Sequence, residues 1–370
     1  MRFVRRPLVA AAVYSSLYCS LFASLTAGCS LNAMTGDMMS AYTVEEMTPY
    51  LLESDDLGMA CETGVSMGAY LMSFERVTDP PDKAAISTLV TAASCAQVEV
   101  WEAELASLRA IKAGVGADAQ DARIRERRAH GVAAKRFYRA WRRVGAAYGA
   151  PGGACPELEE ESDELTWLMG MLAGAQGIQH DRASGGMAGM PLDVPRKAAR
   201  GILCLNNAKW WGVPRALSAA IWTSIPGAAP EGVDPWKVMA EATAVGISSG
   251  MRLAQVIEAQ AIAAAGRTQQ VRAAIVAHAK AIEARPAAGR FRLLDLNATL
   301  QVQVLSDRMW TEATGHRTPI GALGTFWDDE AGEVDDGLLE GLGGDEAPDQ
   351  AAPTDGGDSA AQPQTSEEKQ

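Results

Sequence analysis

The chain has 370 residues and a formal net charge of −13, and 48% of its residues are apolar although only 6% are aromatic. After residue 28 no run of 18 apolar residues occurs, which excludes a membrane protein with several spans. The segment 328–370 holds 14 of the 46 acidic residues and one of the 33 basic residues. The rest of the chain is therefore neutral overall and lacks the basic footprint that a nucleic-acid-binding protein needs.

Residues 1–28 have the three parts of a secretory signal, namely basic residues, an apolar stretch and a small-residue cleavage site. Cys29 follows this site directly, and in that context it resembles the lipidated cysteine of a bacterial lipoprotein. Acyl chains on this thiol would anchor the protein to a membrane leaflet. Ser30 rather than Asp comes next, which favours the periplasmic face of the outer membrane. A signal peptide without lipidation and an uncleaved anchor are the alternatives.

The sequence predicts three further segments after the signal. Residues 29–42 are a tether, residues 43–327 form a helical domain, and residues 328–370 are a disordered acidic tail because they offer little that can be buried. Thr43-Val-Glu-Glu46 has the pattern of a capping box that begins the first helix.

Apolar residues recur at helical spacing through most of the domain, and no alternating β pattern is found. Helices are predicted at about 55–76, 82–112, 118–148, 157–178, 195–207, 213–224, 235–249, 251–265, 267–285 and 290–314. The segment 256–286 resembles one degenerate tetratricopeptide unit, with Ala274, Ala281 and Pro286 at matching positions. The predicted fold is all-α, with antiparallel helical hairpins in a solenoid-like array.

Four cysteines remain outside the signal and the anchor: Cys61, Cys95, Cys155 and Cys204. An even number in an oxidising compartment suggests two disulfides, and none of the spacings is that of a metal site. Two consecutive antiparallel helices carry Cys61 and Cys95, so we favour the pairs Cys61–Cys95 and Cys155–Cys204. Four buried free thiols are the alternative.

The sequence offers little catalytic chemistry. The four histidines lie far apart in the sequence, without metal-ligand spacing, and no cofactor-binding motif is present. Gly246-Ile-Ser248-Ser-Gly250 fits the GxSxG pattern, but a nucleophile elbow needs a strand before the serine. A helix break with close packing is the preferred interpretation of this motif, and His278 is interpreted as a packed core residue. We therefore expect a protein that is not an enzyme, with no metal and no cofactor.

The segment 123–143 is the most basic helix of the chain, with apolar and aromatic residues between its cations. A solvated outer face is the preferred interpretation. Contact with nucleic acid or lipid headgroups, and contact with the acidic tail, are the alternatives. Its basic residues are Arg123, Arg125, Arg127, Arg128, Lys135, Arg136, Arg139, Arg142 and Arg143.

Several segments together resemble the T-component family of TRAP transporters, whose members are periplasmic lipoproteins built of tetratricopeptide-like hairpins. Besides the lipoprotein start, they are Ala134-Lys-Arg-Phe-Tyr-Arg-Ala-Trp-Arg-Arg143 with Tyr148-Gly149, Leu165-Thr-Trp167-Leu-Met-Gly-Met-Leu-Ala-Gly174, Arg290-Phe-Arg-Leu-Leu-Asp-Leu-Asn297 and Leu305-Ser-Asp-Arg-Met-Trp310. The resemblance covers about residues 29–316 and carries no catalytic residues. It implies an adaptor that pairs with the periplasmic substrate-binding protein of a TRAP transporter, and it also implies a homo-oligomer.

The sequence leaves two other functions open as hypotheses. One is a tetratricopeptide-like lipoprotein scaffold that serves envelope assembly. The other is a hydrolase that uses Ser248 on a helical scaffold.

Overall fold

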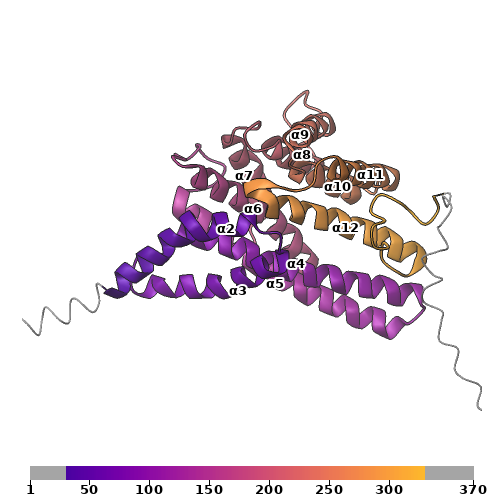
Figure 1. Ribbon diagram of the computed structural model, residues 1–370, viewed down its shortest axis with the longest axis horizontal. Coiled ribbons are helices and arrows are strands. Elements are labelled where there is room, and N and C mark those ends of the chain that lie inside the picture. The colour runs from indigo at the N-terminus through magenta and orange to yellow at the C-terminus, as the bar shows by residue number, and fades with distance from the viewer. Residues whose placement is uncertain (1–30, 330–370) are drawn as a thin grey trace, which may run out of the picture. The chain divides into compact units, whose positions relative to one another are not determined.

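The computed structural model describes residues 31–329 (Figure 1). Every regular element in that range is helical, as the sequence predicts, and eleven α-helices have both ends in it. They are α2 (Thr48–Glu53), α3 (Leu57–Ser73), α4 (Asp82–Lys112), α5 (Gly116–Tyr148), α6 (Glu161–Ser184), α7 (Val194–Gly201), α8 (Val213–Ser224), α9 (Pro235–Ser249), α10 (Leu253–Ala264), α11 (Thr268–Ala284) and α12 (Arg292–Thr314). None of the described helices is long and apolar enough to cross a membrane.

The N-terminal part of the described chain differs from the prediction. Residues 31–42, expected as part of a tether, are helical and continue through a π-helical turn, Thr43–Met47, into α2. The predicted capping box is wrong, because the Thr43 hydroxyl donates to the Met39 carbonyl at 2.7 Å inside a running helix. A proline within a helix clashes with the carbonyl four residues earlier, and a π turn just before Pro49 relieves that clash. The signal and Cys29 lie outside the described residues, as do residues 330–370.

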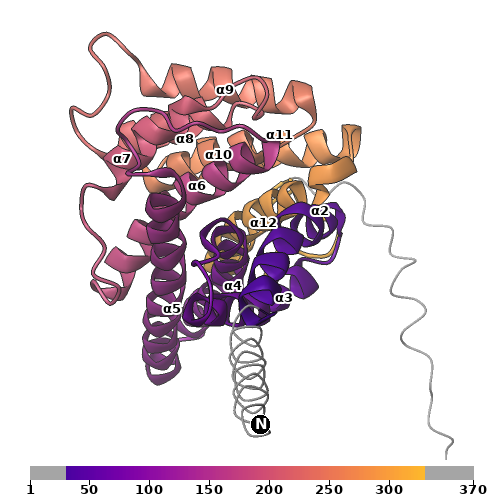
Figure 2. The same ribbon diagram turned by 90° about the vertical axis from the view of Figure 1, so that its left-hand side faces the viewer.

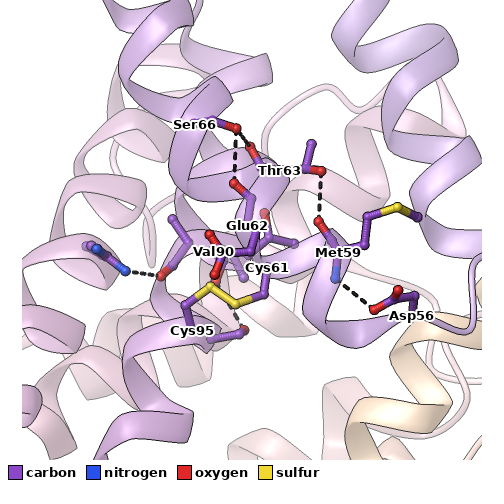
Figure 3. Close-up of a disulfide and its surroundings, with 12 residues drawn as sticks. Asp56, Met59, Cys61, Glu62, Thr63, Ser66, Val90 and Cys95 are labelled. Carbon is purple, nitrogen blue, oxygen red and sulfur yellow. Dashed lines mark hydrogen bonds between the residues drawn. A yellow bond between two sulfur atoms is a disulfide. The ribbon is translucent and has the colours of Figure 1, made fainter.

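Helices α3 and α5 both pack on α4. The Pro80-Pro81 pair separates α3 from α4, and a short turn at Gly114 joins α4 to α5. Figure 3 shows the α3–α4 contact, where the Asp56 carboxylate caps α3 by accepting from the Met59 amide at 2.8 Å. A Cβ at Gly64 would lie 2.6 Å from the Ala92 amide nitrogen. Glycine at this position therefore allows the two helices to approach closely.

Helix α6 lies in the main core and is buried on most of its faces. It begins at Glu161, later than the predicted 157, because the segment before it is a loop that carries Cys155. It packs along α5 through glycines at one-turn intervals, and Gly174 gives room for the indole ring of Trp141. This antiparallel register decides which polar side chains of α5 and α6 meet.

Helices α8 to α11 lie on one side of α12, and α2 to α5 lie on the other (Figures 1 and 2). Helix α9 begins where the sequence predicts, because the Asp234 carboxylate accepts from the Trp236 amide and Pro235 occupies the first turn. Helices α10 and α11 form a hairpin over the predicted tetratricopeptide-like unit and share a second core cluster with α12.

Candidate ligand cavity

A cavity of about 600 Å³ lies between α4, α5, α6, α8, α10 and α12. This volume falls within the range of about 300–1,000 Å³ that is typical of small-molecule sites. The residues that line the cavity come from helices far apart in the sequence, from Gln97 on α4 to Arg308 on α12. No motif in the sequence predicts such a site.

Apolar side chains form most of the cavity wall. Helix α8 contributes Leu217 and Ile221, which lie one turn apart and so share a face, and α12 contributes Val304 and Leu305. The other apolar lining residues include Val100, Leu172, Ile178 and Ile257. A ligand with an apolar body would therefore be removed from water here.

A polar cluster stands among these apolar residues. On α12, the Arg308 Nη2 atom lies 2.7 Å from the Glu104 Oε2 atom of α4. On α5, the His130 Nε2 atom lies 3.8 Å from the Glu126 Oε1 atom, one turn away. The His130 Nδ1 atom in turn lies 2.8 Å from the Nδ1 atom of His180 on α6. We refer to Glu104, Glu126, His130, His180 and Arg308 as the polar cluster.

Both histidines of the polar cluster are held neutral. Burial, and next the neighbouring His130, lower the pKa of His180 to about 3, and the His180 ring stacks on Phe137. Burial also lowers the pKa of His130. Because the two Nδ1 atoms share one hydrogen, one ring donates and the other accepts. Of the two Nε2 atoms, one can therefore accept a hydrogen bond and the other can donate one.

The carboxyl groups of the cluster differ from each other. Glu104 is neutralised by its ion pair with Arg308. Burial and the charge of Glu104 raise the pKa of Glu126, although Arg123 and Arg308 partly oppose this effect. The cluster can thus form several directed hydrogen bonds with a ligand, and the ion pair of Glu104 and Arg308 balances its own charge.

Acid should destabilise the folded chain in a window set by these histidines. An unfolded histidine binds a proton below pH about 6.5, whereas folded His180 remains neutral down to about pH 3. The unfolded state then binds more protons, so stability falls as the pH drops from about 6.5, by up to about 1.4 kcal/mol per pH unit for each such group. Thermal melting at pH 7.5 and pH 5 should show this loss.

Two substitutions make that measurement specific. His180→Phe should reduce the difference in melting temperature between the two pH values. A residual slope should come from His130 and from His278, whose pKa burial lowers to about 4. Ala277→Phe, which adds an aromatic ring at an exposed position and removes no titratable group, should leave the difference unchanged. If the melting temperature depends on pH equally in the wild-type chain and in His180→Phe, the loss of stability in acid does not come from His180.

Ser248 and His278, which the sequence singles out individually, lie away from the cavity. Ser248 is exposed on α9 and its hydroxyl donates to the Val245 carbonyl at 2.9 Å, and no strand precedes it in the described chain. Helix α9 ends one residue later, at Ser249, as the helix-break interpretation predicts, and a Cβ at Gly246 would lie 2.8 Å from the Met251 carbonyl oxygen. His278 is a packed core residue, with its Nδ1 atom 2.8 Å from Gln255 Oε1.

The four cysteines form two disulfides in the structure. One joins Cys61 on α3 to Cys95 on α4, as Figure 3 shows, with the Cα atoms 5.3 Å apart. The other joins Cys155, in the loop before α6, to Cys204, with the Cα atoms 5.4 Å apart. Neither disulfide lines the cavity. Within residues 31–329 no group of three His, Cys, Asp or Glu residues is placed to hold a metal ion.

Sequence reasoning missed all five residues of the polar cluster. The four histidines are far apart in sequence, yet the structure brings His130 and His180 into hydrogen-bond contact. One local signal was available, because Glu126 and His130 lie four residues apart and so share a face of one helix. Nothing local points to Glu104 or Arg308.

We compared the chain with protein-family models, curated proteins and solved structures. No family model, curated protein or solved structure matches it. Its function is therefore inferred from the cavity and from the amino-acid sequence.

Proposed function

We propose that this chain is a lipid-anchored binding or adaptor protein of the bacterial periplasm, attached to the outer membrane and without catalytic activity. The observation that carries the proposal is the cavity of about 600 Å³, which joins apolar walls to a cluster of hydrogen-bonding side chains. The signal-like residues 1–28 followed by Cys29 support the location. Two disulfides also support it, because such bonds persist in oxidising compartments.

The partner that we propose is the periplasmic substrate-binding protein of a TRAP transporter, as the resemblance to the T-component family implies. The finer fold belongs to the same proposal: the helical hairpins form a degenerate tetratricopeptide-like array. The hairpin of α10 and α11 over residues 256–286 supports it. In that role the chain would handle a solute during uptake, alone or as a homo-oligomer.

Capture from the envelope tests this function. The tagged full chain, extracted in neutral detergent, should retain a periplasmic solute-binding protein that mass spectrometry identifies. Native mass spectrometry should also detect a bound small molecule. Ala220→Trp would fill the cavity from α8 and should abolish that mass, whereas Ala277→Trp, at an exposed position on α11, should not. Capture of envelope-assembly proteins alone would favour the scaffold alternative. If both tryptophan variants retain the mass of the bound small molecule, the cavity is not its binding site.

Cys29→Ser should release the chain from membranes. Buried acyl chains contribute about 0.8 kcal/mol per CH₂, and the substitution removes the thiol that would carry them. Sedimentation of carbonate-washed membranes measures the effect, with Ser30→Ala as the control that should remain bound. If the Cys29→Ser chain still sediments, the anchor is not at this cysteine.

A further inference from the structure

A second hollow, of about 620 Å³, lies between α3 and α5. Leu89 and Ala92 of α4 form its floor, since both flanking helices pack on α4. We call it the arginine groove, because Arg136, Arg139, Arg142 and Arg143 of α5 form one wall. No lining residue is shared with the ligand cavity described above.

Two of the four arginines hold the groove in shape. Arg136 donates from Nη1 to the Ala92 carbonyl at 2.6 Å, which ties α5 to the floor. Arg143 pairs with Asp82 at 2.8 Å and with Glu75 at 2.9 Å. Among the residues that the structure describes, Glu75 is the one acidic residue that lines the groove, and its salt bridge with Arg143 already engages it.

The other two arginines are available to a ligand. Arg139 and Arg142 are exposed, and neither has a hydrogen-bond or ion-pair partner among the described residues. Residues 127–156 contain seven basic residues and no acidic residue. An ordinary solvated helix face mixes both signs of charge, so this wall carries an uncompensated positive charge that attracts anions.

The opposite wall is apolar. Helix α3 presents Val65, Ala69 and Met72, and Val65 remains 37% exposed. Gly68 adds no side chain above Leu89, where even an added Cβ would lie 3.8 Å from the Leu89 Cδ2 atom. Unpaired cations thus face an apolar strip across a narrow hollow. That combination fits a molecule with an anionic head and an apolar chain.

The size of the groove favours a lipid over a protein segment. Its volume is that of a small-molecule site, whereas a docked helix has a diameter of about 10–12 Å with its side chains. The N-terminal helical residues 31–42 contact the segment that follows α3, where the Thr78 hydroxyl donates to Asp37 at 2.6 Å. Met72, near the end of α3, and Glu75, just after it, line the groove. The groove therefore lies beside the part of the chain that is nearest the predicted anchor.

We propose that the arginine groove binds a single-chain anionic lipid of the membrane. Its carboxylate or phosphate lies between Arg139 and Arg142, and its acyl chain lies along Val65, Ala69 and Met72. Charge-assisted hydrogen bonds from two guanidinium groups hold the head, and burial of the chain supplies the remaining affinity. The proposal needs neither the solute cavity nor the TRAP partner.

Titration with dodecyl phosphate, followed by native mass spectrometry of the full chain in neutral detergent, tests this site. A one-to-one adduct is expected for the wild-type chain. The double variant Arg139→Gln/Arg142→Gln should weaken binding at least about tenfold, because it removes two charge-assisted contacts. The matched control Arg123→Gln/Arg128→Gln removes the same charge from exposed positions of α5 outside the groove and should bind like the wild-type chain.

A third variant tests the apolar wall without changing charge. Ala69→Trp should block the groove from an exposed position of α3 and weaken the binding of dodecyl phosphate as strongly as Arg139→Gln/Arg142→Gln does. Thermal melting should show that this variant retains the fold. Equal loss in the Arg123/Arg128 control would show nonspecific charge attraction and overturn the proposal. If inorganic phosphate binds as tightly as dodecyl phosphate, the alkyl chain of the ligand contributes nothing to binding, and the proposed lipid site is wrong. Binding of an acidic peptide but not of dodecyl phosphate would assign the groove to a protein partner instead.

Discussion

Replacing Asp295 by alanine should lower the free energy of unfolding by about 3–5 kcal/mol, because it leaves a buried guanidinium without its counter-charge. The side chains of Arg252 and Asp295 are 2% and 1% exposed. Arg252 also donates to the Ala281 carbonyl at 2.9 Å and to the Arg285 carbonyl at 2.5 Å. This one side chain thereby joins the start of α10, the end of α11 and α12.

A matched surface pair provides the control for this prediction. Arg215 and Glu241 form a salt bridge of 3.0 Å whose side chains are 43% and 48% exposed. Glu241→Ala should therefore cost only about 0–1 kcal/mol. Urea unfolding of both variants measures the difference. If Asp295→Ala costs no more than Glu241→Ala, the buried pair does not hold the three helices together.

Replacing both partners separates charge from packing. In the double variant Arg252→Met/Asp295→Leu no buried charge remains, and apolar side chains of similar size fill the space. This variant should be more stable than Asp295→Ala alone, since the penalty of an unpaired buried charge has been removed. The two carbonyls that Arg252 satisfies lose their donor, so recovery should be partial.

Most helix boundaries were predictable because local chemistry sets them. Helix α4 begins at Asp82 directly after the Pro80-Pro81 pair, and Asp234-Pro235 starts α9 through a cap and a fixed φ angle. The spacing of apolar residues, together with capping residues and prolines, determines such helix ends within a few residues. The capping box at Thr43 shows the limit of this reasoning, because the helix that precedes it continues without a break.

The candidate cavity was not predictable, because it depends on register between distant helices. His130 and His180 are fifty residues apart and meet only because α5 and α6 run antiparallel with one particular alignment. A weak signal for that alignment exists. Gly174 and Gly177 of α6 face Trp141 and Phe137 of α5, and His180 lies about one turn further along. Glycine spacing on α6 indicates a close partner helix but does not identify it.

Reduction of both disulfides should destabilise the chain by several kcal/mol. Cys61–Cys95 joins residues 34 apart in sequence, and Cys155–Cys204 joins residues 49 apart. In the chain-entropy model, closing loops of these lengths contributes about 3–4 kcal/mol each by restricting the unfolded chain. Melting with and without reductant, and with alanine at each pair in turn, measures the two contributions.

The two disulfides should differ in what their loss releases. Without Cys61–Cys95, α3 still packs on α4 through the close approach at Gly64, so the apolar contact remains. Without Cys155–Cys204, Leu158 still packs against the core and Arg200 Nε still donates to the Gly152 carbonyl at 3.0 Å, but the exposed residues 153–155 between these contacts lose their covalent tie. Proteolysis should therefore cut the second variant at 151–160 before it cuts the first variant near α3. Labelling of all four cysteines by a thiol reagent in the native, oxidised chain would contradict both bonds.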